Sequence, residues 1–164
     1  MKVIYCDGSS LGNPGRGGWG VVALDTSKKL IWEYGEKVDH ATNNQMELAA
    51  TIFALKLILK SNENEIGKEF ELRLDSKYVI QGTTEWLKNW VKNNWKNSQK
   101  KDVLNKEYWQ EILKLITEIK VKKIKIKWTH VYGHTGEKWN ERVDEIARGK
   151  AGGENIILLK GQSF

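Results

Sequence analysis

The sequence has little cysteine, little proline and no long apolar run. Its one cysteine, Cys6, excludes an internal disulfide and suits a reducing compartment. Its one proline, Pro14, stands among glycines and marks a turn. No apolar stretch approaches the length that a bilayer requires, and residues 1–10 lack the apolar segment of a signal peptide. We therefore expect a cytoplasmic protein without a membrane segment.

The charge balance of the chain is basic. Its 164 residues suffice for one domain with a real core. Lys and Arg number 27 against 21 Asp and Glu, so the formal net charge is +6. There are eight tryptophans, several of them in one basic stretch. A basic surface favours a polyanionic partner such as nucleic acid.

Four carboxylates separated by long gaps stand out against this basic background. Each lies at the end of a predicted strand or on a helix beside the predicted core: Asp7, Glu47, Asp75 and Asp144. Acidic groups at the margins of apolar elements are costly unless they are paired, and no matching set of Lys or Arg lies at the same margins. Divalent cations are their natural partners. Carboxylates gathered around metal in a basic protein suggest phosphodiester chemistry.

Hydrophobic periodicity predicts an α/β fold in which helices flank a mixed sheet. Residues 8–20 are predicted to form a loop, and Thr42 with Gln45 to form a capping box. Glu47 is expected in the first turn of the helix that follows. The predicted strands are 3–6, 21–24, 29–38, 70–75 and 124–128, and the predicted helices are 46–60, 76–81, 84–94, 106–119 and 139–151.

Four sequence blocks, in this order, resemble type 1 ribonuclease H. They are DGSSLGNPGRGGWG at 7–20, TNNQMEL at 42–48, DSKYV at 75–79, and Gly133-His134 followed by NERVDEIA at 140–147. The resemblance covers about residues 1–150. It implies the ribonuclease H-like fold, with a five-stranded mixed sheet, in a domain of residues 1–152. Residues 153–164 would form a C-terminal tail without an assigned role.

The resemblance also implies an activity and a site. A monomeric endoribonuclease would hydrolyse the RNA strand of RNA/DNA hybrids with two Mg²⁺ ions, or Mn²⁺ in their place, and leave 5′-phosphate and 3′-hydroxyl ends. Asp7 would bridge the ions, and Glu47, Asp75 and Asp144 would complete the site. His134 would transfer a proton or assist product release. Glu141 would assist at the second metal, or else lie on a solvated helix face.

The same blocks suggest where substrate binds. A set of small polar side chains would line the minor groove of the hybrid: Asn13, Asn43, Asn44, Ser76 and Gln81. Thr42 and Asn43 would hold a phosphate of the DNA strand at a helix N-terminus.

Residues 86–101 resemble the basic protrusion that some family members carry. One interpretation is a helix with inward tryptophans and solvated lysines. The other is a surface that meets phosphates without reading sequence. Trp86 and Trp90 would pack, and Lys88 and Lys92 would join the phosphate surface. The predicted substrate contacts in this stretch are Trp86, Trp95, Lys96, Lys100 and Lys101.

Two other motifs match known binding patterns but lack the local structure that those patterns require. The segment Gly15–Gly20 matches G-x-G-x-x-G, but a strand pattern follows it and not a helix, so a hairpin whose bare backbone lets the hybrid approach is favoured. His130 and His134 have the spacing of a helical zinc site, but the residues between them argue against a helix.

Two alternative functions stay open. One is a nuclease of the same superfamily that acts on DNA, against which the Asn, Thr and Gln residues beside the acids speak. The other is an inactive nucleic-acid-binding module, which should have lost at least one of the four acids.

Overall fold

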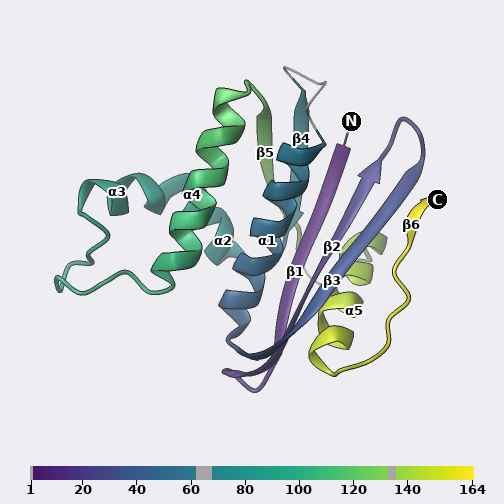
Figure 1. The fold of residues 1–164 in the computed structure, drawn as a ribbon, viewed down its shortest axis with the longest axis horizontal. Helices are drawn as coiled ribbons and strands as arrows, with labels where there is room; N and C mark the ends of the chain where they lie inside the picture. Colours follow the sequence, from purple (N-terminus) through teal and green to yellow (C-terminus); the bar gives the residue numbers. More distant parts are fainter. Residues whose placement is uncertain (1, 62–67, 133–135) are drawn as a thin grey trace.

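A six-stranded mixed sheet forms the centre of this computed structural model, which describes residues 2–61, 68–132 and 136–164 (Figure 1). The strand order is β5-β4-β1-β2-β3-β6. An antiparallel meander comes first, and two later strands add to it in parallel with β1. The strands are β1 (Lys2–Leu11), β2 (Gly15–Asp25), β3 (Leu30–Ala41), β4 (Glu69–Leu74), β5 (Lys125–His130) and β6 (Lys160–Ser163).

Helices cover both faces of the sheet. α1 (Asn43–Lys60) packs on β1 and also against α4 (Lys106–Val121), while α5 (Lys138–Ala151) packs on β1, β2 and β3. Alternation along β1 divides the core accordingly, because Ile4 belongs to the cluster beneath α1 and α4, whereas Val3 belongs to the cluster beneath α5. None of the described helices is long and apolar enough to cross a bilayer.

The predicted α/β class is confirmed, but the sheet has six strands and not five. The additional strand, β6, comes from the C-terminal tail and pairs antiparallel with β3. Its residues, Lys-Gly-Gln-Ser, carry no strand pattern and are exposed. Backbone pairing to an open sheet edge, which sequence periodicity does not report, therefore determines this strand.

The predicted loop at residues 8–20 is wrong, because β1 continues to Leu11 and β2 already begins at Gly15. The glycines serve packing within this hairpin. A Cβ atom on Gly18 would lie 2.3 Å from the backbone nitrogen of Ala151, and one on Gly20 would lie 2.9 Å from the carbonyl oxygen of Val143. Glycine thus lets α5 lie directly on β2, and these two positions face the helix, whereas the sequence favoured an open backbone for the hybrid.

Residues 87–105 extend outward beyond α4, away from the sheet (Figure 1). The predicted helix at 84–94 is divided into a π-helical turn, η1 (Gly82–Trp86), and a short helix, α3 (Leu87–Lys92), after α2 (Lys77–Gln81). A Cβ atom on Gly82 would lie 1.9 Å from the Trp109 ring, so only glycine allows this turn to contact α4. We call residues 86–101 the protrusion.

Candidate active site

Asp7 and Asp75 are neighbours because the strands that deliver them are parallel and adjacent. In the β1–β4 register Cys6 pairs with Leu74, so the residue after each one lies at the same edge of the sheet. Asp7 is 4% exposed, and Asp75 is partly buried. The parallel pairing of the two predicted strands is therefore sufficient to bring the two carboxylates together.

Glu47 reaches the same edge from α1. The predicted capping box is present, since Thr42 Oγ1 accepts from the Gln45 amide at 3.1 Å and Gln45 Oε1 accepts from the Thr42 amide at 3.0 Å. The helix begins at Asn43, so Glu47 lies just beyond the first turn and not within it as predicted. A Cβ atom on Gly8 would lie 2.3 Å from the Glu47 nitrogen, so β1 can pass this close only with glycine there.

These three carboxylates form one cluster, in which one oxygen of each residue lies within 4.8 Å of the others. Asp144 comes from the opposite face, on α5, and is near enough to Asp7 to raise the pKa of that carboxyl. It also forms an ion pair with Arg148, whose Nη2 lies 2.6 Å from Asp144 Oδ2. The sequence did not single out Arg148, although its place one turn after Asp144 is the usual spacing of a helical ion pair.

Burial and neighbouring negative charge both make the ionised forms of these carboxylates unfavourable. Burial raises the pKa of Asp7, the charge of Asp75 raises it further, and together with Asp144 they bring it to about 8 despite a lowering hydrogen bond from Glu47. Burial also raises the pKa of Glu47 well above its ordinary value, and the charge of Asp7 adds to this. A cation placed among these oxygens would relieve both effects.

The donor set suits a hard divalent cation. It consists of carboxylate oxygens from a strand, a helix and a strand end, and Mg²⁺ prefers oxygen ligands while keeping part of its water shell. No histidine or cysteine belongs to the cluster found among the described residues, as a zinc site would favour. The residues present therefore fit magnesium-type coordination.

Of the two predicted site residues near the start of α5, the structure describes only one. His134 lies outside the described residues. Glu141 is exposed near the start of α5, and its backbone amide donates to the Glu137 carbonyl at 3.0 Å. Asn140, which the sequence did not single out, is buried, and its Oδ1 has no hydrogen-bond partner among the described parts of the chain.

Several predicted substrate contacts already have partners. Asn13 Oδ1 accepts from the Asn43 amide at 3.0 Å, and Asn43 Oδ1 accepts from the Ser10 amide at 2.8 Å. These bonds tie the β1–β2 hairpin to the start of α1. Ser76 caps α2 by accepting from the Val79 amide at 3.2 Å. The side chains of Asn44 and Gln81 are exposed.

The tryptophans of the protrusion pack against one another. The ring of Trp90 lies 5.7 Å from that of Trp86, 6.2 Å from that of Trp95 and 5.2 Å from that of Trp109. Trp95 therefore joins this cluster as Trp86 and Trp90 do, although the sequence assigned it to the substrate.

The lysines of the protrusion differ in their surroundings. Lys96 pairs with Asp102 at 2.6 Å. The others are exposed: Lys88, Lys92, Lys100 and Lys101.

Comparisons with known proteins agree with this geometry. Residues 1–152 match the family model for RNase H. A Ribonuclease H from Thermosynechococcus vestitus is 42% identical over 158 residues, which cover 96% of this chain and 93% of that protein. A Ribonuclease H from Geotalea uraniireducens is 43% identical over 151 residues, which cover 90% and 92%.

Solved structures share the fold. LC9-RNase H1, a type 1 RNase H with the type 2 active-site motif, matches with a TM-score of 0.78 at 26% identity, over 97% of this chain and 76% of that chain. LC11-RNase H1, solved in complex with an RNA/DNA hybrid, matches with a TM-score of 0.70 at 24% identity, over 93% of this chain and 98% of that chain.

Proposed function

The chain belongs to the ribonuclease H family of metal-dependent enzymes, and on this premise we propose that it hydrolyses the RNA strand of RNA/DNA hybrids. The observation that carries the proposal is the cluster of Asp7, Glu47 and Asp75, whose oxygens lie within 4.8 Å of one another. The cluster lies within the residues that match the family model. A DNA-acting nuclease and an inactive binding module are the alternatives.

In this proposal the four carboxylates would hold two Mg²⁺ ions, or Mn²⁺ in their place. Asp7 would be the shared ligand, because Glu47, Asp75 and Asp144 all act on its pKa. When bound, the ions would supply an activated water and stabilise the leaving 3′ oxygen, so that 5′-phosphate and 3′-hydroxyl ends would remain. His134 would move a proton at this site, and Glu141 would assist at the second ion.

The polar residues near the acids would position the hybrid. The side chains of Asn13 and Asn43 each use their oxygen in the bonds described above. Their side-chain NH₂ groups would therefore serve as donors to the substrate. With Thr42, Asn44, Ser76 and Gln81 they would contact 2′-hydroxyls and phosphates. A monomeric state and a cytoplasmic location remain predictions of the sequence.

The test is substrate selectivity with and without metal. Labelled RNA/DNA hybrid, RNA duplex and DNA duplex are incubated with the protein in Mg²⁺ or in chelator, and the ends of the products are mapped. We expect cleavage of the RNA strand of the hybrid alone, and only with Mg²⁺. Cleavage of the DNA duplex would favour the DNA-acting alternative, and hybrid binding without cleavage would favour the inactive module.

We also propose that the protrusion binds phosphates through its exposed lysines. Lys100→Gln with Lys101→Gln should raise KM and reduce the salt slope of hybrid binding by about 1–2, because each lost phosphate contact reduces it by about 0.9. Lys96 is less suitable for the test because its ion pair with Asp102 would also be lost. The matched control is Lys114→Gln with Lys120→Gln, two exposed lysines of α4 outside the protrusion. Equal slopes in the two double variants would exclude a phosphate surface here.

A further inference from the structure

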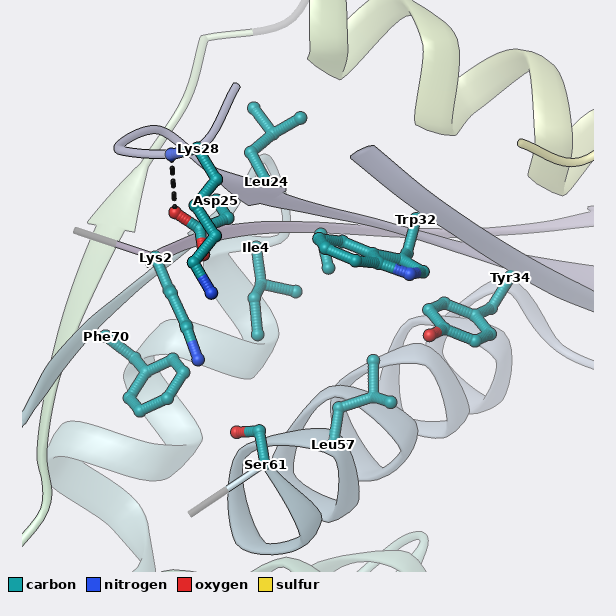
Figure 2. A pocket seen from close by; sticks show the side chains of 11 residues that line it. Lys2, Ile4, Leu24, Asp25, Lys28, Trp32, Tyr34, Leu57, Ser61 and Phe70 are labelled. Atoms are coloured by element: carbon teal, nitrogen blue, oxygen red, sulfur yellow. Dashed lines mark hydrogen bonds between the residues drawn. The ribbon is translucent and has the colours of Figure 1, made fainter. Parts of the chain in front are cut away.

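A cavity of about 290 Å³ lies at the end of the sheet opposite the acids. It is bounded by the start of β1, the end of β2, the start of β3 and the end of α1 (Figure 2). Lys2 at its rim and Asp7 in the acid cluster are five residues apart on β1, a separation of about 17 Å at 3.3–3.4 Å per residue. The cavity therefore does not belong to the candidate active site.

The walls of this cavity are apolar and aromatic. Ile4 and Phe70 are buried on one side of it, and the rings of Trp32 and Tyr34 are half-buried on the other side (Figure 2). The volume is near the lower limit for ligand pockets, so it suits a single flat ring system better than a larger molecule.

The rim of the cavity is basic. Lys2 and Lys28 lie on one side of it (Figure 2). An adjoining cavity of about 350 Å³ shares both lysines and adds Lys68 together with the acidic Glu69. Asp25 also lines both cavities, but its carboxylate is engaged in its own turn, where Oδ1 accepts from the Lys28 amide at 3.1 Å and from Ser27 Oγ at 2.6 Å.

Further lysines extend this rim along the same end of the sheet. The Lys125 amide donates to the Lys68 carbonyl at 3.0 Å, which places the start of β5 beside the start of β4. Three exposed lysines follow there: Lys122, Lys123 and Lys125. Within the described ranges of the chain none of the three forms an ion pair. We call these three residues the lysine edge.

We propose that this end of the molecule binds single-stranded nucleic acid. An unstacked base would enter the cavity against Trp32 and Tyr34, and the phosphates that follow would lie along Lys2, Lys28 and the lysine edge. Aromatic side chains combined with a basic track are the usual means of binding single strands. A base that stays paired in a duplex cannot enter the cavity, and a small anion would use only one or two of the lysines. The inference goes beyond the proposed hydrolysis and does not depend on the acids.

The first test follows the Trp32 indole N–H signal by NMR in chelator. The probe is an oligothymidylate about eight nucleotides long, within the site size of single-strand binders, and its control is an abasic strand of equal length. We expect the Trp32 signal to shift with the oligothymidylate and much less with the abasic strand. An unchanged Trp32 signal, or equal shifts with both strands, would overturn the proposal.

The second test removes the lysine edge with Lys122→Gln, Lys123→Gln and Lys125→Gln. Its matched control removes the same charge elsewhere, with Lys37→Gln, Lys114→Gln and Lys150→Gln. The salt slope for the oligothymidylate should fall by about 2 in the first variant, at about 0.7 per phosphate contact, and stay unchanged in the control. Equal losses would mean general attraction and overturn the proposal. Cleavage of a blunt hybrid should survive in both variants, so the hydrolytic proposal is tested separately.

Discussion

Asp7 and Glu33 are both buried carboxylates of the central sheet, but their surroundings are opposite. Glu33 is 0% exposed, and Arg142 donates to both of its oxygens at 2.8 Å while the Leu159 amide adds a bond at 3.0 Å. Burial alone would raise the pKa of Glu33, but these hydrogen bonds outweigh it and the pKa is lowered. Around Asp7, burial and neighbouring carboxylates raise the pKa to about 8.

The difference separates a carboxylate that is paired within the chain from one that we propose as a metal ligand. Arg142 also donates to the Ile157 carbonyl at 2.8 Å, so the ion pair fastens α5 to β3 and to the tail. Glu33 thus has its cation built into the chain. Asp7 lies among Glu47, Asp75 and Asp144, an arrangement that a divalent cation from solution would stabilise. Burial of a carboxylate alone therefore does not support a metal site, and the proposal for Asp7 rests on the neighbouring carboxylates.

The largest expected effect comes from Asp7→Asn. This change removes the carboxylate that the other three acids surround, and with it the ligand that would bridge the metal ions. Cleavage of the hybrid should fall by about 10³-fold or more, since metal ions supply several kcal/mol of transition-state stabilisation and each 1.36 kcal/mol is a factor of ten. Single-turnover assays at saturating Mg²⁺ measure the loss.

Hybrid binding is the control for that variant. Asp7→Asn should bind the hybrid at least as well as the unchanged protein in chelator, because the proposed phosphate contacts are elsewhere and a negative charge is gone. Unchanged turnover in Asp7→Asn would show that the acid cluster is not the active site.

The next largest effect is on stability, from Arg142→Met. This change leaves the Glu33 carboxylate buried without its cation and should lower the free energy of unfolding by about 3 kcal/mol. Urea denaturation measures it. The double variant Glu33→Gln with Arg142→Met should recover part of the loss, since no buried charge remains. A double variant less stable than Arg142→Met alone would contradict the assigned role of the pair.

A smaller effect should follow from Gly18→Ala, which tests how α5 brings Asp144 to Asp7. The new Cβ atom would lie 2.3 Å from the Ala151 nitrogen, so α5 has to move away from β2. We expect a loss of about 2 kcal/mol in stability, typical of overpacking, together with reduced cleavage at saturating substrate. Gly153→Ala is the control, because a Cβ atom there meets no neighbour within 4 Å, although its φ of +74° adds local strain. Equal cleavage in both variants would mean that the close approach of α5 does not serve the site.

The smallest predicted effect is a gain in stability and not a loss. In chelator, Asp7→Asn should be more stable than the unchanged protein by about 1 kcal/mol near pH 8, in the range of single stabilising changes. The pKa of Asp7 is about 8 in the folded state, against an ordinary value of 3.8 that the unfolded chain should have. The folded state therefore binds the Asp7 proton more tightly than the unfolded state does. The unchanged protein therefore loses stability as pH rises from about 4 to about 8.

Thermal melts at both ends of that range measure this effect. The difference between the two proteins should be nearly absent at pH 4 and largest at pH 8. A gain in stability that is equal at both pH values would arise from packing and not from charge.

The acid cluster was predictable because its causes are local. An apolar run before Asp7 and alternation before Asp75 indicated the two strands, and parallel pairing makes the two residues neighbours. Asp7 does not end its strand as predicted, because β1 continues to Leu11. The capping box likewise indicated the start of α1 and hence the place of Glu47. Metal ligation itself stays a prediction, as do the substrate contacts.

The parts that were missed depend on contacts between distant segments. Glycines at 15–20 read as a loop because glycine usually marks turns, whereas here Gly18 and Gly20 are required by α5. The pairing of Glu33 with Arg142 joins residues 109 positions apart, and no local pattern relates them. The strand at Lys160–Ser163 follows from that anchoring of the tail to β3.

The most direct measurement is calorimetric titration of Mg²⁺ into the protein without nucleic acid. The unchanged protein and the variant Glu33→Gln with Arg142→Met should bind Mg²⁺ alike, because neither substituted residue belongs to the acid cluster. Asp7→Asn should lose this binding. Equal Mg²⁺ binding by Asp7→Asn and the unchanged protein would contradict the central claim that the carboxylates around Asp7 form the metal site.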